Sequence, residues 1–213
     1  MMREKEIEAV HPPNLGWLQY RLDPQEMDYV WRCIKNKGEN FNKGLVGHVS
    51  NSYKLIDRGQ WFFINTIKPL ITNYVDHFDS TLADNIPTKQ RHPYFMENWW
   101  VNYQKQHEFN PIHNHSGVYS FVIWMKIPYD CEKQNKKDIA RNSNTPSIGT
   151  FQFSYQNILG EGDAKSYYLS PKDEGIMLFF PSRLDHQVYP FYDCDEERIS
   201  VSGNISVDSS KRA

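Results

Sequence analysis

The stretch RISVSGNISV, residues 198–207, shows the pattern from which the fold can be predicted. In an extended strand, successive side chains point to opposite faces of a sheet. The even positions therefore share a polar face, and the odd positions share a face that is apolar apart from a glycine. The polar face consists of Arg198, Ser200, Ser202, Asn204 and Ser206. We expect a strand with an apolar side packed in a core, while Arg198 and Ser200 together suit a carboxylate through a guanidinium fork and a hydroxyl.

Short runs rich in aromatic and β-branched residues begin at about residue 93 and predict further strands. These runs cover residues 94–104, 118–127, 149–155, 166–169, 176–180 and 187–189. Turn signals such as SPKDEG, residues 170–175, separate them. Several short strands without helices between them indicate an antiparallel sandwich or barrel.

Residues 1–92 carry the helical patterns. Asp23, with Pro and Glu following at the first and third helical positions, predicts a helix that runs to about Lys37 and stops at Gly38. Apolar residues at mostly helical spacing predict a second helix over residues 60–78, which Pro69 is expected to kink.

The pattern therefore divides one expected domain, residues 1–213, into three parts. Residues 1–92 form a helical flanking part, 93–207 a β core and 208–213 a tail. The fold class is α+β, mainly β. Residues 129–147 are dominated by Asp, Lys, Asn, Ser and Arg, so we expect a long polar loop that is either a surface insertion or a lid.

Composition excludes several classes of protein. The 213 residues include 24 Lys and Arg against 26 Asp and Glu, and this near-neutral balance argues against a nucleic-acid partner. No apolar run reaches the roughly 20 residues of a membrane helix, and the N-terminus lacks the apolar segment of a signal peptide. Three scattered Cys predict no disulfide framework and suit a cytoplasm, that of the host if a phage encodes the chain. The oligomeric state cannot be predicted.

Three of the eight His form a pattern with metal-binding chemistry. His113 and His115 are two residues apart, so both imidazoles can face one point in an extended chain. His186 follows an apolar strand that ends in Pro-Ser. Imidazole binds Fe, Zn, Cu and Ni well. The 12 residues from His186 to Arg198 are long enough for a hairpin, so we expect Arg198 on the strand paired with that of His186.

The order HxH, then His, then RxS resembles the Fe(II)- and 2-oxoglutarate-dependent oxygenases, in particular a bacterial and phage branch in which HxH replaces HxD. The resemblance covers residues 93–207. It implies a double-stranded β-helix, a jelly-roll and cupin-like fold, with N-terminal flanking helices. It also implies a dioxygenase that hydroxylates an unidentified substrate, such as a prolyl or asparaginyl residue or a small molecule, and releases succinate and CO2. The implied cofactors are Fe(II), 2-oxoglutarate and O2, with ascorbate as an optional addition.

The resemblance leaves the ligand set open, because the family's usual site contains a carboxylate at the place of His115. His113, His115 and His186 form a three-His site in the interpretation we favour. Alternatively His115 is the first ligand and Gly117 takes the carboxylate place, or Asp185 supplies the acid from beside His186, although its side chain should point away on a strand.

The resemblance assigns the cosubstrate to one end of the site. The distal carboxylate of 2-oxoglutarate is expected at Arg198, with a hydrogen bond from Ser200. Asn102 and Gln104 share a strand face and are candidate partners for its other carboxylate or for a ligand, although ordinary polar residues on a half-wet strand are an equal alternative. Two other functions remain open: a zinc or other metal-binding cupin-type enzyme, and a non-catalytic jelly-roll binding module.

Overall fold

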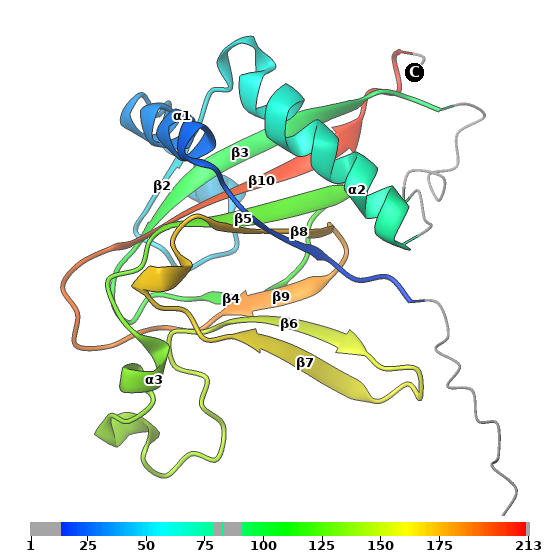
Figure 1. Cartoon of the computed structure of the whole chain (residues 1–213). Coiled ribbons are helices and arrows are strands. Elements are labelled where there is room, and N and C mark those ends of the chain that lie inside the picture. The colour runs from blue at the N-terminus through cyan, green and yellow to red at the C-terminus, as the bar shows by residue number, and fades with distance from the viewer. Residues whose placement is uncertain (1–13, 79–81, 83–90, 212–213) are drawn as a thin grey trace, which may run out of the picture.

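A computed structural model describes residues 14–78, 82 and 91–211, in which ten strands form two antiparallel sheets (Figure 1). The remaining positions of the expected flanking part and tail, including the N-terminal ten residues, lie outside the described residues. The larger sheet has the order β1 (Leu18–Arg21), β8 (Ile176–Pro181), β5 (Tyr119–Lys126), β10 (Arg198–Val207), β3 (Tyr94–Gln104) and β2 (Asn51–Lys54). The smaller sheet has the order β4 (Asn110–His113), β9 (Asp185–Val188), β6 (Phe151–Gln156) and β7 (Gly162–Tyr167).

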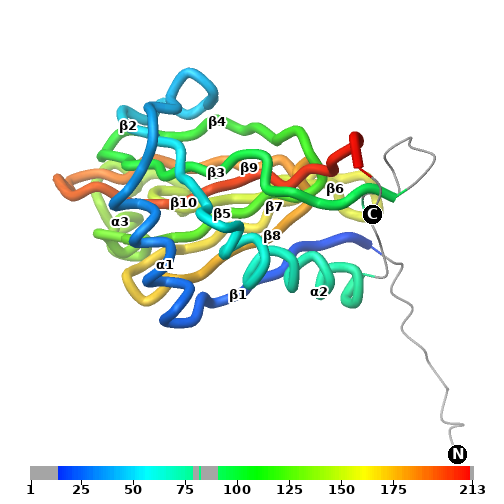
Figure 2. Tube along the Cα trace, turned by 90° about the horizontal axis from the view of Figure 1, so that it is seen from above, coloured from blue at the N-terminus to red at the C-terminus, as the bar shows by residue number. Residues whose placement is uncertain are grey.

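The two sheets face each other, and this arrangement confirms the expected mainly β fold, a double-stranded β-helix. Helices α1 (Pro24–Lys35) and α2 (Lys68–Phe78) lie across the outer face of the larger sheet, as the view from above shows (Figure 2). The outer face of β10 contributes buried Val201, Gly203 and Ile205 to the core beneath these helices. A second apolar cluster, which includes Trp124, Phe151 and Phe153, fills part of the space between the sheets.

Steric crowding on the outer face of β10 explains why a glycine occupies position 203. It is paired with Trp99 on one neighbouring strand and with Phe121 on the other. A Cβ at this position would lie 2.5 Å from the Phe121 ring and 2.9 Å from Cβ of Trp99. The glycine therefore lets two large aromatic side chains flank one central strand, where any side chain would displace them.

The predicted strands are found with shifted ends, but three strands were not predicted. β3 and β10 have the expected bounds. β1 and β2 lie within the part expected to be helical, and β4 ends at His113, the first of the His pair. These three strands are only four residues long. β1 alternates apolar and polar residues over too short a run to predict a strand, and β2 and β4 show no such alternation, so pairing with distant strands determines their conformation.

The expected hairpin between His186 and Arg198 is wrong. His186 lies on β9, which pairs with β4 and β6 in the smaller sheet. Arg198 begins β10, which pairs with β3 and β5 in the larger sheet. The intervening residues cross from one sheet to the other, so the two side chains approach across the sandwich rather than along a ladder.

The first helix confirms its predicted start and corrects its end. Asp23 accepts a hydrogen bond from the Glu26 backbone, and the Glu26 carboxylate accepts one from the Asp23 backbone, so the capping box is complete. The helix ends at Lys35 instead of Lys37. The Asn36 backbone N–H still donates to the Arg32 carbonyl, but the Lys37 N–H donates to Ile34, only three residues back, so the last turn is tighter than an α-helix.

The second helical region runs without a break from Trp61 to Phe78, close to the predicted residues 60–78, but part of it is π-helical. A 3₁₀ turn (Arg58–Gln60) precedes a π-helical segment (Phe63–Ile67), which runs into α2. Pro69 lies near the start of α2, where the missing N–H and the ring would disturb a regular turn. The wider π turn lies directly before Pro69, where it relieves the clash of the proline ring with the preceding turn.

The expected polar loop, residues 129–147, is more ordered than its composition predicts. It contains α3 (Cys131–Gln134) and a 3₁₀ turn (Asp138–Ala140). Tyr129 and Cys131 are buried, and the Asn135 side chain bonds the backbone of Ile148 in both directions. The three Cys are free thiols. Within the described part of the chain, no helix is long and apolar enough to cross a membrane.

Candidate functional site

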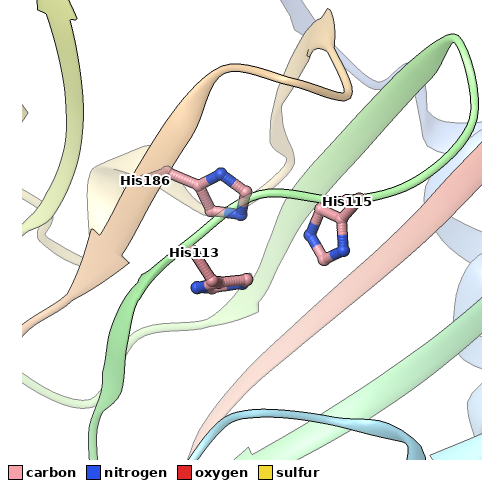
Figure 3. A group of neighbouring side chains, drawn as sticks. All are labelled: His113, His115 and His186. Atoms are coloured by element: carbon pink, nitrogen blue, oxygen red, sulfur yellow. The ribbon is translucent and has the colours of Figure 1, made fainter.

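The structure brings His113, His115 and His186 together between the sheets (Figure 3). His113 ends β4 and is the register partner of His186 on β9. His115 lies on the chain that leaves β4, where its backbone N–H donates to the Ser182 carbonyl. Nitrogens from all three rings lie within 4.8 Å of one another. Two nitrogens that bind one ion from opposite sides, through bonds of about 2.1 Å, lie about 4 Å apart. The His nitrogens are therefore almost close enough together to bind a single ion.

Hydrogen bonds fix the tautomer of two of these rings. Nδ1 of His113 lies 2.7 Å from the Pro111 carbonyl, and Nδ1 of His186 lies 2.9 Å from the Leu184 carbonyl. A carbonyl only accepts, so each Nδ1 carries the proton and each Nε2 keeps its lone pair for a metal. Burial lowers the pKa of His113, and it lowers the pKa of His115 to about 4 and of His186 to about 3. The imidazoles are therefore neutral, as metal ligands must be.

No carboxylate belongs to this cluster among the described residues. Asp185 instead accepts a hydrogen bond from the Asn114 side chain at 2.7 Å. Gly117 has a φ of 97°, and a Cβ there would lie 2.8 Å from the Ile205 carbonyl oxygen. Gly117 thus makes the turn that leads into β5, a conformation and a space that suit glycine.

Arg198 lies buried at one end of the space between the sheets. Its Nη1 donates to the Tyr129 hydroxyl at 2.6 Å, and its Nη2 donates to the side-chain oxygen of Gln104. Burial raises the pKa of Tyr129 to about 12, so its hydroxyl keeps the proton that it donates to the Gly149 carbonyl at 2.8 Å. The Arg198 Nε is buried and has no hydrogen-bond partner among the described residues. A buried guanidinium with a free donor fits an anionic ligand.

The other three residues predicted to bind the cosubstrate line the same cavity, and their side chains differ in the hydrogen bonds that they form. The Ser200 hydroxyl forms no hydrogen bond with any described residue, and it lies one step along the strand face from Arg198. Asn102 accepts from the Ser52 hydroxyl at 2.7 Å, which leaves its amide nitrogen free toward the cavity. Gln104 donates to the Glu108 carbonyl at 2.6 Å while it accepts from Arg198, so both ends of its amide are occupied.

A cavity of about 310 Å³ connects the three His to Arg198. Trp100 and Trp124 are buried and form part of its wall. The segment from Phe41 to Val49 closes another side. Sequence reasoning missed this segment, which lines the cavity, and Tyr129, which contacts Arg198, since neither carries a motif and both come from distant parts of the chain.

Metal and cosubstrate chemistry both fit these residues. The His cluster offers neutral nitrogen donors with fixed tautomers, which suits a divalent ion such as Fe(II). The unpartnered Nε of Arg198 and the free Ser200 hydroxyl offer hydrogen bonds to a carboxylate in the same cavity. The arrangement can therefore hold a metal and a dicarboxylate side by side.

The family match covers most of the residues of this cavity. A family model described as "Putative 2OG-Fe(II) oxygenase" matches residues 98–204, half of the chain. This range contains the three His, Arg198 and Ser200. A search by sequence among curated proteins gives no match.

Several solved structures are similar in fold. A 2OG-Fe(II) oxygenase family oxidoreductase from Burkholderia pseudomallei superposes with a TM-score of 0.54 and 13% identity, covering 90% of this chain and 85% of that chain. A Pseudomonas putida prolyl-4-hydroxylase gives 0.47 and 13%, covering 92% and 94%. HygX from Streptomyces hygroscopicus, solved with nickel, 2-oxoglutarate and hygromycin B, gives 0.48 and 9%, covering 92% and 84%. The first of these supports the double-stranded β-helix fold.

Proposed function

Because the chain belongs to the 2OG-Fe(II) oxygenase family, an enzyme family that depends on Fe(II), 2-oxoglutarate and O2, we propose that it is a dioxygenase that hydroxylates its substrate and releases succinate and CO2. The observation that carries the proposal is the joint presence, in one cavity, of three neutral His and a buried Arg with a free donor. The substrate in this proposal is a protein residue, such as a prolyl or asparaginyl residue, or a small molecule. Family membership favours this function over a zinc cupin or a non-catalytic module.

The metal is held by His113, His115 and His186 in this proposal. The carbonyl partners of two Nδ1 atoms keep the corresponding Nε2 atoms available, and His115 completes the cluster. A ligand set of three neutral imidazoles brings no negative charge. We therefore expect weaker Fe(II) binding than at a site with a carboxylate.

The distal carboxylate of 2-oxoglutarate is bound by Arg198 and Ser200 in this proposal. Tyr129 and Gln104 occupy one donor on each Nη atom and so orient the guanidinium. Gln104, expected to contact the cosubstrate itself, acts instead through Arg198, since both ends of its amide are bonded to protein. Asn102, with a free amide nitrogen, is the proposed donor to the carboxylate nearer the metal.

When bound, iron and 2-oxoglutarate supply the oxidising chemistry, and the protein supplies position and shelter. The aromatic side chains Trp124, Phe151 and Phe180 line the cavity and exclude water from it. Both sheets and the Phe41–Val49 segment contribute to this one cavity, which supports our proposal that residues 1–213 act as a single domain.

The first test is 2-oxoglutarate turnover by Fe(II)-loaded protein, prepared without O2 and then exposed to it. We expect succinate only when both O2 and 2-oxoglutarate are present. Parallel samples with and without ascorbate test whether that reductant contributes. Absence of succinate, together with no absorption change when 2-oxoglutarate is added to the Fe(II) protein, would reject the proposed function.

The second test concerns the ligand set. His115→Ala should weaken Fe(II) binding strongly if three His hold the ion. The matched control is His77→Ala on the exposed side of α2, which should bind iron as the unmodified protein does. Unchanged iron affinity in His115→Ala would leave the two-His alternative as the better description.

A further inference from the structure

The cavity extends beyond the space that the proposed cosubstrate needs. The polar face of β10 carries Arg198, Ser200, Ser202 and Asn204 along the cavity wall. The His cluster lies near the level of Ser202, because the His115 ring is 6.0 Å from Trp100, the register partner of Ser202. At roughly 3.3 Å per residue, Ser202 is about 13 Å from Arg198 along the strand.

A bound 2-oxoglutarate would span most of this interval. Its five-carbon chain spans roughly 5 Å, with carbon bonds of about 1.5 Å, and a hydrogen bond of about 3 Å and a metal bond of about 2 Å bring the total to about 10 Å. Asn98 and Asn204, which are register partners on β3 and β10, lie one step beyond the His cluster. This end of the cavity, lined by Asn98, Ser116, Ser202 and Asn204, is called the outer half below.

The outer half presents polar groups without partners. The Ser120 hydroxyl donates to the Asn204 side-chain oxygen at 2.8 Å, so the Asn204 amide nitrogen is the end left free. Neither the Asn98 side chain nor the Ser202 hydroxyl forms a hydrogen bond with a described residue. The pairing of β10 with β3 shifts register directly after Asn204, where Glu97 of β3 has no partner on β10, and such bulges commonly redirect side chains near active sites.

The outer half carries no charge of its own. Among the described residues that line the cavity, the ionisable side chains are the three His and Arg198, all of which the proposed function already uses. A charged substrate group placed here would lose its water without gaining an opposite charge, which is strongly unfavourable. A neutral group with both donors and acceptors would satisfy the free amide ends.

We propose that the outer half binds an uncharged amide of the substrate, either a peptide bond or a carboxamide. The inference rests on the proposed function, because the position of 2-oxoglutarate defines which half remains. Asn98 has a donor and an acceptor that pair with an amide C=O and N–H, and the Asn204 nitrogen supplies a second donor to the same C=O. The Trp100 and Phe41 rings, 5.6 Å apart, give the adjoining wall an apolar surface for the carbon atoms beside the amide.

The test measures binding directly, with Zn(II) in place of Fe(II) so that no turnover occurs. The full chain is loaded with Zn(II) and 2-oxoglutarate, and ligand-observed NMR titrations give the Kd of five small probes. N-acetylalanine N′-methylamide represents a peptide bond and propionamide a carboxamide. N-acetylalanine and alaninamide carry a negative and a positive charge, and methyl glucoside is an uncharged polyol.

We expect one of the two neutral amides to bind at least tenfold more tightly than either charged probe and the polyol. The amide that binds more tightly shows whether the bound substrate group is a peptide bond or a carboxamide. Asn204→Leu should weaken that binding at least fivefold while 2-oxoglutarate affinity stays within twofold, and the control Asn144→Leu, on the exposed 129–147 segment, should change neither. If Asn204→Leu does not fold, Asn98→Ala provides the same comparison.

Equal or absent binding of the amides, or an unchanged affinity in Asn204→Leu, would overturn the inference. Displacement of the amide by added 2-oxoglutarate would also overturn it, because the probe would then occupy the cosubstrate half. Failure of the Zn(II) protein to bind 2-oxoglutarate at all would instead reject the proposed function, so the two failures are distinguishable.

Discussion

The two faces of strand β10 lie in different environments. On the outer face, Val201, Gly203 and Ile205 are buried in an apolar core under α1 and α2. On the inner face, Arg198 and Ser200 are buried too, yet they line a cavity and retain free hydrogen-bonding groups. Alternate residues of one strand therefore have separate environments, the odd positions packed in the core and the even positions facing the cavity where we propose that ligands bind. Substitutions on the two faces should change different measurements.

The largest effect is expected across the cavity from β10, at the metal. His186→Ala removes a ring that is buried and held by the Leu184 carbonyl. Removing a residue that only hydrogen-bonds to a metal ligand commonly weakens metal affinity about 10–100-fold. We therefore expect removal of a ligand itself to weaken Fe(II) binding by more than about 100-fold. Competition with a chelator measures the affinity. Near-normal iron binding would show that His186 is not a ligand.

The next effect belongs to the outer face. Ile205→Ala leaves a cavity in the core and should lower the free energy of unfolding by about 2–5 kcal/mol, measured by urea denaturation. Ile205→Val should cost only about 0.5–1.5 kcal/mol, and 2-oxoglutarate affinity of the folded protein should stay within twofold for both. A large loss of 2-oxoglutarate affinity in Ile205→Val would contradict the separation of the two faces.

Arg198→Met tests the inner face with a side chain of similar length and no charge. We expect 2-oxoglutarate affinity to fall about 100-fold, since charge-assisted hydrogen bonds contribute about 1.5–3 kcal/mol. Calorimetry on the Zn(II) protein measures it, and Zn(II) affinity should change less than twofold. If metal binding is lost instead, Arg198 supports the His cluster rather than the cosubstrate.

The smallest effect concerns the residue that orients Arg198. Tyr129→Phe removes the hydroxyl at 2.6 Å from Nη1 and keeps the ring stacked on Phe191. A neutral hydrogen bond contributes about 1 kcal/mol, which corresponds to about fivefold in 2-oxoglutarate Kd. The control Tyr168→Phe, at a half-exposed ring, should leave the Kd unchanged. Equal affinities in Tyr129→Phe and the unmodified protein would assign Tyr129 a packing role alone.

The sequence predicted most where local pattern and final environment agree. The alternation in residues 198–207 and the long aromatic run at 94–104 predicted two strands with their observed bounds, and the Asp23 capping box predicted the start of α1. The three His and Arg198 were predicted as one site from their order in the chain, and they do line one cavity.

Other features depend on partners far away in the sequence. Spacing between His186 and Arg198 does not show that the chain crosses to the other sheet between them, so the expected hairpin was wrong. Tyr129 contacts Arg198, 69 residues away in the sequence, and belongs to a segment whose polar composition predicts a loop, either a surface insertion or a lid. The four-residue strands β1, β2 and β4 exist because neighbouring strands offer them hydrogen bonds, which local pattern does not reveal.

His113 and His186 share one local device: in each, Nδ1 meets the carbonyl two residues earlier in its own chain, and the two residues are partners across β4 and β9. Each ring is thus oriented by its own strand before any ion arrives, so these two rings need little rearrangement at the moment of capture. Loading should then be fast and repeatable, and protein stripped with a chelator should recover its metal on simple re-addition without a refolding step. His115, whose ring lacks such a bond among the described residues, is the ligand whose orientation the ion itself must complete.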